Sequence, residues 1–419
     1  MNREEVVKKD SLDPLQSFID RFVITDTDTI YLDGNSLGRL PKQTQQEIPR
    51  MVNQEWGETL IEGWQHNWFC APQRVGSKIA KIVGAQAGEV IVADSTSINL
   101  FKLVVSALNY QVNRSNIVTD EFNFPSDHYI LKSALKASDK EDGQLTIVSS
   151  QDGISISYED IADSLDQNTA VLCLSQVAFK SGYLYDMVKI NKLAKSKGVL
   201  VVWDLSHSVG AVPIDLNRSG AELAVGCTYK YLNGGPGAPA FLYVRKELVE
   251  KLSNPITGWF GHSNLFAFDL DYTPAIGIER FQVGTPPVLS LQAIEYGVDI
   301  LIDAGMEQIR SKSVQLSEYL IELYDEKLKG LGFSLNSPRD FESRGSHVSF
   351  GHSQGYQIAK SLIHDKKVIP DFREPDNIRI GIAPLYTSFC HIFDFVERLE
   401  EITFHKLHEK HSSERSIVT

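Results

Sequence analysis

The sequence predicts an α/β fold, with a large domain that has a mostly parallel central sheet and helices on both faces, plus a smaller α+β domain. Apolar stretches at 169–177 and 199–206 are continuous rather than alternating, and a helical pattern at 187–198 separates them. Strands that are apolar on both sides belong to sheets covered on both faces. Short strand and helix patterns alternate again over 346–402 and predict the smaller domain.

The region 89–135 contains the same unit twice, an apolar strand followed by a polar turn and a helix. In the first unit, Ser95 or Thr96 suits the N-cap of the helix, because its hydroxyl can accept from the first free N–H groups. In the second unit, a proline-containing loop leads into a helix that we expect to be capped near Ser126 or Asp127. Units of this kind build parallel sheets.

Three segments are expected along the chain. Residues 1–55 form an N-terminal segment that contributes to the small domain, 56–310 form the large domain, and 311–419 form the small C-terminal domain. A long helical pattern at 313–331 is expected to bridge the two domains.

Composition narrows the class of protein. The 419 residues are 42% hydrophobic and 23% charged, as in ordinary globular proteins. A formal net charge of −13 argues against nucleic acid as a partner, since proteins that bind it usually carry a basic face. No run reaches the roughly 18 apolar residues of a membrane helix, and the N-terminus lacks an apolar signal segment. Four scattered cysteines without a CxxC pair favour a reducing compartment, so we expect a cytoplasmic protein without membrane or metal partners.

An acid and a lysine carry the predicted chemistry. Asp204 ends an apolar strand, where open α/β sheets place their ligands. Lys230 follows 26 positions later, after another apolar stretch and before a glycine-rich loop. A pyridoxal phosphate site needs such a pair, because the lysine forms a Schiff base and the acid pairs with the protonated pyridine nitrogen. Alone, Asp204 would more simply be a turn or capping residue.

Two further features suit such a site. Thr96 and Ser97 open a helix whose free N–H groups can bind a phosphate, and Phe124 lies beside a loop where it can stack on an aromatic ring. Hydroxyls that only cap the helix and a phenylalanine that belongs to the core are the plainer alternatives. Cys227 could be a nucleophile, but a buried cysteine of an apolar strand is the simpler interpretation. Four elements in suitable chain order together favour the cofactor site.

Several motifs together resemble the kynureninase family, fold-type I pyridoxal phosphate enzymes of the aspartate aminotransferase superfamily. The motifs run in the family's order from residue 32 to residue 389 and read LDGNSLG, FPSDHY, DLSHSVG, TYKYLNGGPG, GWFGH and NIRIGIAPLYTSF. The lysine motif alone implies only the superfamily, whereas LDGNSLG with FPSDHY and GWFGH is more specific.

The resemblance implies a role for each matching residue. Lys230 would hold the cofactor and then act as base and acid on the substrate carbons, while Asp204 would pair with the pyridine nitrogen. Phe124 would stack on the ring, with Asp127 beside it as a cofactor-binding and catalytic residue. Arg379 would bind the substrate's α-carboxylate, since a planar guanidinium matches a carboxylate in two bonds.

Other positions of the family pattern would surround cofactor and substrate. Tyr229 would either donate a proton near the substrate ketone or only bind the phosphate. Trp64 and Thr285 match positions beside the substrate's aromatic ring, where animal enzymes that favour 3-hydroxykynurenine carry histidine and asparagine. The remaining cofactor contacts that the resemblance implies are Thr96, Ser97, Ser175, His207, Trp259 and, a second time, Thr285.

The family reaction is the hydrolytic Cβ–Cγ cleavage of L-kynurenine to anthranilate and L-alanine. A bulky Trp64 removes a polar partner for a ring hydroxyl, so weaker activity on 3-hydroxykynurenine is expected. Members of this fold usually build each site from two subunits, which implies a homodimer.

The sequence disfavours two other functions. A cysteine desulfurase or selenocysteine lyase needs a reactive cysteine on a mobile loop, and neither Cys70 nor Cys390 lies in an obvious glycine-rich loop. A non-catalytic ligand sensor would normally lack Lys230 or carry a DNA-binding segment.

Overall fold

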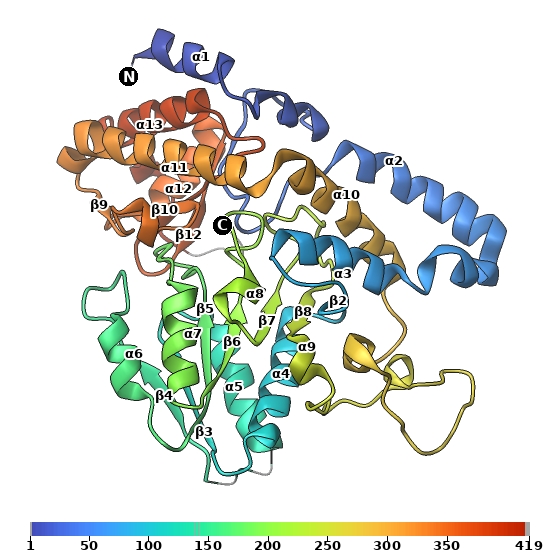
Figure 1. The fold of residues 1–419 in the computed structure, drawn as a ribbon. Coiled ribbons are helices and arrows are strands. Elements are labelled where there is room, and N and C mark those ends of the chain that lie inside the picture. Colours follow the sequence, from blue (N-terminus) through green and yellow to red (C-terminus); the bar gives the residue numbers. More distant parts are fainter. Residues whose placement is uncertain (1, 139, 141, 415–419) are drawn as a thin grey trace.

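A computed structural model describes residues 2–138, 140 and 142–414. The chain forms two regions, with the first and last helices together at one end and most strands at the other (Figure 1). The larger region is built on a seven-stranded sheet in the order β2-β8-β7-β6-β5-β3-β4. Its strands are β2 (Val90–Val92), β3 (Asn116–Asp120), β4 (Leu145–Val148), β5 (Thr169–Ser175), β6 (Leu200–Asp204), β7 (Leu223–Gly226) and β8 (Phe241–Val244).

The five strands from β4 to β7 in this order run parallel, whereas β8 runs antiparallel to both of its neighbours. The predicted mostly parallel sheet is therefore confirmed. Along β5, Leu172 and Leu174 face one apolar core, and Val171 and Cys173 face another. Successive side chains of a strand point to opposite faces, so a continuous apolar run is what a sheet covered on both faces requires.

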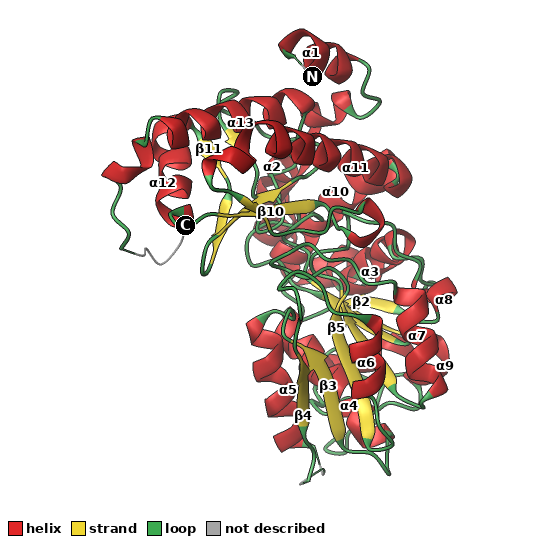
Figure 2. Cartoon of the chain, turned by 90° about the vertical axis from the view of Figure 1, so that its left-hand side faces the viewer, coloured by secondary structure: helices red, strands yellow, loops and turns green. Residues whose placement is uncertain are grey.

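Helices cover both faces of this sheet, as Figure 2 shows for the strands β3, β4 and β5. One face packs against α4 (Thr96–Tyr110) and α5 (Pro125–Ala137). The other packs against α3 (Ala71–Ile82), α6 (Tyr158–Ser164), α7 (Met187–Ser196) and α10 (Val288–Ala304). The short helix α8 (Leu216–Ser219) joins β6 to β7, and α9 (Lys246–Val249) follows β8. Helix α2 (Lys42–Arg50) packs on α10.

The N-caps predicted from the sequence can be compared with those of α4 and α5. Ser95 is the N-cap of α4 and its side chain accepts from Ile98 N–H, as the sequence predicts. The predicted cap of α5 near Ser126 or Asp127 is wrong, because Phe124 occupies the N-cap without a side-chain hydrogen bond. Pro125 is the first residue of α5, a position that suits proline since its fixed φ is helical and the missing N–H would be unpaired there.

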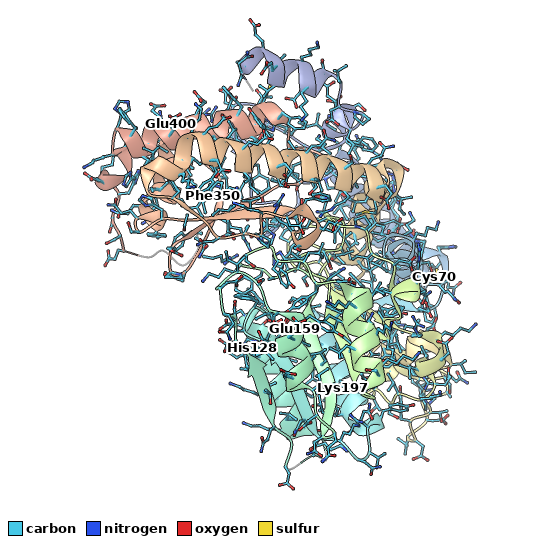
Figure 3. The ribbon with its side chains drawn as sticks, turned by 60° about the vertical axis from the view of Figure 1, so that its left-hand side comes forward. Cys70, His128, Glu159, Lys197, Phe350 and Glu400 are labelled. Atoms are coloured by element: carbon cyan, nitrogen blue, oxygen red, sulfur yellow. The ribbon has the colours of Figure 1, made fainter. Side chains whose placement is uncertain are left out.

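The smaller region is an antiparallel α+β unit. Its sheet has the order β12-β13-β10-β9, and a two-stranded parallel sheet joins β1 and β11. Phe350 of β10 lies below α11 in Figure 3 and stacks on Tyr324 with ring centroids 5.2 Å apart. The elements are α1 (Arg3–Ser11), β1 (Ile30–Tyr31), α11 (Met306–Leu323), β9 (Ser334–Leu335), β10 (His347–Gly351), α12 (Gly355–Lys366), β11 (Val368–Ile369), β12 (Asp371–Arg373), β13 (Asn377–Gly381) and α13 (Phe389–Phe404).

Helix α11 contributes to the cores of both regions. Ile309, near its start, belongs to the core of the larger region, whereas Leu316 and Tyr319 belong to the core of the smaller one. The N-terminal segment is divided in the same way, since Val6 packs in the smaller core and Leu15 in the larger. Within the described part of the chain, no helix is both long and apolar enough to cross a membrane.

Candidate active site

Lys230 lines a cavity of about 340 Å³ at the edge of the seven-stranded sheet. Asp204 is the last residue of β6, and Lys230 lies in the loop that follows β7. Parallel strands bring their carboxyl ends to one edge, so both residues reach the same cavity. Gly38 packs closely on the lysine loop, because its N–H donates to Tyr229 O at 2.8 Å and an added Cβ would lie 2.3 Å from Lys230 O. Only glycine fits this approach.

The acid and the lysine are each held by a neighbour from the loop after β6. Asp204 Oδ1 accepts from Ser206 N–H at 2.8 Å and from Ser206 Oγ at 2.6 Å, which fixes the carboxylate. Lys230 Nζ lies 2.9 Å from His207 Nε2. Burial, together with the positive charges of Lys230 and Arg379, lowers the pKa of His207 well below its ordinary value. The imidazole beside the lysine is therefore neutral at physiological pH.

Two other groups that line the cavity have raised pKa values. Burial and the negative charge of Asp204 raise the pKa of Asp127 well above its ordinary value. Burial, with the neighbouring Cys227 and Asp204, raises the pKa of the Tyr229 hydroxyl. The Tyr229 phenol can therefore donate a hydrogen bond into the cavity, and the Asp127 carboxyl binds its proton more tightly than an exposed one.

The cavity fits a ligand that is aromatic, polar and phosphorylated. Asp127 Oδ2 and His207 Nδ1 are buried and have no hydrogen-bond partner among the described residues, so a polar ligand would satisfy them. Ser95, Thr96 and Ser97 line the cavity at the first turn of α4, where helix N–H groups favour a phosphate. Phe124, also in the lining, is 40% exposed. These groups suit pyridoxal phosphate.

Arg379 brings the smaller region into the same cavity. It lies on β13 and is buried, with its guanidinium donating to Phe179 O at 2.6 Å, to Ser36 Oγ at 3.0 Å and to Asp371. An arginine has five N–H donors, and its Nε has no partner among the described residues. Arg379 thus retains donors for a ligand carboxylate at the cavity.

Most of the residues expected from the sequence lie in this one place. Ser175 is close behind them, since it pairs with Asp204 in the β5–β6 register, but it does not line the cavity. The expected residues that line the cavity are Thr96, Ser97, Phe124, Asp127, Asp204, His207, Tyr229, Lys230 and Arg379.

Trp64, Trp259 and Thr285 form a second group, apart from this cavity. The Trp64 ring lies 5.9 Å from Phe260, which itself packs on Trp259 with centroids 5.1 Å apart. Trp64 also lines an apolar hollow with residues 287–290, directly after Thr285. Trp259 is 44% exposed and Thr285 is exposed as well. One copy of the chain does not bring this group to Lys230.

Eight residues of the cavity lining were not expected as site residues from the sequence. A partial signal existed for five of them, because they belong to the motifs that indicate the family: Asn35, Ser36, Ser126, Ser206 and Gly237. Arg373 gives no such signal, since its place depends on the pairing of β12 with β13. The other two are Ser95, which was expected only as a helix cap, and Ala238.

Cysteines do not contribute to the cavity. All four are free thiols, and none of them lines it, although all four lie in the described part of the chain. Cys70 is exposed elsewhere, and burial raises the pKa of the Cys390 thiol to about 12, which suppresses the reactive thiolate. Over residues 2–138, 140 and 142–414, no cluster of His, Cys, Asp or Glu is placed to hold a metal ion.

Comparison with solved structures shows that the chain shares its architecture with known proteins. A cysteine desulfurase from Thermococcus onnurineus NA1 superposes with a TM-score of 0.78 over 97% of this chain and 99% of its own, at 18% identity. A C-DES mutant with glycine linked to its PLP cofactor also reaches 0.78, over 90% of this chain and 97% of its own, at 17% identity. At such low identity these likenesses show the fold alone, and they confirm the predicted fold class.

Sequence comparison is more specific. Residues 309–399 match the kynureninase C-terminal domain. A kynureninase from Pseudomonas fluorescens is 41% identical over 96% of this chain and 95% of its own length, and one from Burkholderia pseudomallei strain 1106a is 40% identical over the same shares. Identity of this extent, over nearly the whole of both chains, confirms the resemblance that the motifs indicate: the chain belongs to the kynureninase family.

Proposed function

We propose that this chain is a kynureninase that hydrolyses L-kynurenine to anthranilate and L-alanine with pyridoxal phosphate. The observation that carries the proposal is one cavity that joins Lys230 and Asp204 of the larger region with Arg379 of the smaller. Family membership supplies the reaction, and the cavity supplies groups for each part of it. Bound pyridoxal phosphate provides the electron sink that makes the bond beside the amino-bearing carbon labile.

The chain's own residues hold the substrate and move protons. The free donors of Arg379 bind the α-carboxylate, which orients the rest of the amino acid toward Lys230. Lys230 Nζ moves the proton at the α-carbon, with the neutral His207 ring 2.9 Å away as its neighbour. Asp204 holds the proton of the cofactor's pyridine nitrogen. One water is consumed, and its oxygen ends in the anthranilate carboxylate.

Tyr229 is the proposed proton donor near the ketone. Its raised pKa keeps the phenol protonated, and it lines the cavity beside Lys230. A hydroxyl in this place can donate as charge develops on the ketone oxygen. Asp127, whose pKa is also raised, is proposed to donate to the cofactor from the same wall.

We also propose a homodimer whose sites are shared. The expected residues fall into two separate groups, one around Lys230 and one around Trp259 and Thr285. The second group is surrounded by exposed apolar side chains, and a face of this kind suits a protein interface. These side chains are Trp56, Leu60, Ile61, Phe266, Phe268 and Leu270. A second copy would bring its Trp259 and Thr285 to the cofactor and its Trp64 toward the substrate ring.

Mixing two inactive variants tests shared sites directly. Lys230→Ala and Trp259→Ala homodimers should each be poorly active. In a mixed dimer, both defects fall in one site if Trp259 acts across the interface, which leaves the other site intact. Co-refolded protein should therefore regain activity, whereas sites contained within one chain would regain none. Light scattering on the same samples gives the oligomeric state.

Substrate preference follows from the ring pocket. With Trp64 in place of a polar residue, 3-hydroxykynurenine should react more weakly than L-kynurenine. We also place the enzyme in the cytoplasm on the basis of its free thiols. The proposed domain limits are 56–310 for the larger domain and 311–419 for the smaller one, to which residues 1–55 contribute. Cell fractionation and limited proteolysis test these two points.

The activity test is a fluorescence assay for anthranilate. Protein loaded with pyridoxal phosphate is given L-kynurenine and, in parallel, 3-hydroxykynurenine. Strong anthranilate formation supports the proposal, and a preference for the hydroxylated substrate would contradict the ring-pocket assignment. A cofactor-loaded protein that forms no anthranilate overturns the function, and cysteine would then be the next substrate.

A further inference from the structure

Lys102 is a buried cation that the proposed chemistry does not use. It lies on α4, two turns after the residues that line the cavity, and its side chain is fully buried. Its Nζ donates to Asp94 Oδ2 at 2.8 Å and to Phe281 O at 2.6 Å. Burial lowers the pKa of Lys102, and the negative charge of Asp94 offsets part of that shift.

Asp94 has a left-handed backbone conformation in the turn before α4. Its φ is +47°, in a region that glycine, asparagine and aspartate adopt more readily than other residues. The turn continues directly into Ser95, Thr96 and Ser97, which line the cavity at the proposed phosphate position. The direction of their N–H groups therefore depends on how Asp94 is held.

Stability alone does not explain a lysine at this position. Its neighbours on α4, Leu100, Leu103 and Val104, are fully buried and apolar. Lys102 loses its hydration on burial, whereas the side chain of its partner Asp94 stays 30% exposed, so the pair offers little net stability over an apolar residue. The contacts of Lys102 suit a role in holding the turn at Asp94 in place.

The contact of Lys102 with Phe281 O reaches toward the other group of expected residues. Phe281 leads into the segment that ends at Thr285, and Val283 O in that segment accepts from Phe260 N–H at 3.1 Å. A Cβ on Gly258 would lie 2.4 Å from Val283 O, so this segment and the one that carries Trp259 are tightly packed. Lys102 is the direct link between the turn at Asp94 and this segment.

We propose that Lys102 is a positioning residue for the cofactor phosphate, which acts by clamping Asp94 in its left-handed conformation against Phe281 O. It touches no substrate or cofactor atom in this role. The inference rests on the proposed cofactor site, and it adds a residue outside the cavity on which phosphate affinity depends.

The test compares two ligands of the apoenzyme. Pyridoxal phosphate and pyridoxal differ only in the phosphate, and the dissociation constant of each is measured by absorbance titration. Lys102→Met should weaken binding of the phosphorylated ligand roughly tenfold, as expected when one supporting contact of a binding group is lost, and leave pyridoxal unchanged. Lys132→Met, an exposed lysine on α5, is the matched control.

A double variant separates positioning from folding. Asparagine tolerates the left-handed region well and carries no charge that needs Lys102. Asp94→Asn with Lys102→Leu should therefore restore the affinity for pyridoxal phosphate, whereas Asp94→Asn alone leaves a buried lysine unpaired and should not. If Lys102→Met itself does not fold, the double variant against wild type still decides whether the ion pair can be replaced.

Three results overturn the inference. The first is Lys102→Met binding pyridoxal phosphate as tightly as wild type, the second is an equal loss of both ligands with a lower melting temperature, and the third is a double variant that does not recover affinity. Failure of the proposed function is a different result, in which the wild-type apoenzyme itself does not bind pyridoxal phosphate.

Discussion

The two walls of the cavity are built in different ways. On the wall from the larger region, Asp204 and Lys230 lie at the ends of parallel strands, and buried atoms of Asp127 and His207 lack partners among the described residues. On the wall from the smaller region, Arg379 lies on an antiparallel strand and is paired with Asp371. The first wall therefore carries ionisable groups available for proton transfer, whereas Asp371 holds Arg379 in place for binding. We therefore expect variants of the first wall to act on kcat and those of the second on KM.

Lys230→Ala should have the largest effect. Loss of the amine removes both the attachment of the cofactor and the proposed proton transfer, so kcat should fall at least about 10³-fold. Anthranilate fluorescence measures the rate, and the visible absorbance of bound cofactor gives a second readout. Lys246→Ala, an exposed lysine beyond β8, is the control. Substantial residual turnover would show that the lysine is not the reactive group.

Arg379→Lys should raise KM for L-kynurenine by about 100-fold with a smaller change in kcat, because an ammonium keeps the charge but loses the paired donors. Steady-state kinetics separate the two constants. Arg398→Lys, on the outer side of the same region, should leave KM unchanged; its guanidinium donates to Lys366 O at 2.7 Å. A fall confined to kcat would assign Arg379 to the chemical step and remove the contrast between the walls.

Asp371→Asn should have an intermediate effect, because it leaves Arg379 in the cavity but loosens it. Asp371 is buried and also pairs with Arg373 at 3.0 Å, so one carboxylate orients two arginines. KM should rise about tenfold, the loss expected for one supporting hydrogen bond, while affinity for pyridoxal phosphate stays constant. A matched loss of cofactor affinity would instead indicate general disruption, which a melting curve would confirm.

The contrast between the walls also explains how much of the site the sequence predicts. Asp204 and Lys230 could be found because each follows an apolar run, and a strand end is a local signal. Arg379 needed the family motif, since an arginine in a short strand is otherwise unremarkable. Asp371 and Arg373 were not found, because their place depends on β12 pairing with β13 and on that sheet packing against the larger region. The cap of α5 failed for a local reason, as Pro125 takes the first helical position and moves the N-cap to Phe124.

Replacing Asp33 should have the smallest effect of these changes, and it should alter stability rather than catalysis. It lies beside the end of β13, where its backbone pairs with Gly381, and burial with the charge of Asp371 raises its pKa to about 6. Arg379, Arg373 and the Ser36 hydroxyl lower its pKa but do not offset the burial.

The raised pKa of Asp33 sets the direction in which stability changes with pH. Between the unfolded pKa, about 3.9, and the folded value, the folded state binds more protons, so stability falls as pH rises through this window. Asp33→Asn removes the titration, and wild type should lose about 1 kcal/mol more than the variant in unfolding free energy between pH 5 and pH 8. Urea unfolding at the two pH values measures the difference. An equal change in both proteins would mean that Asp33 ionises normally. The charges of Arg379, Arg373 and Asp371 would then not depend on the protonation of Asp33.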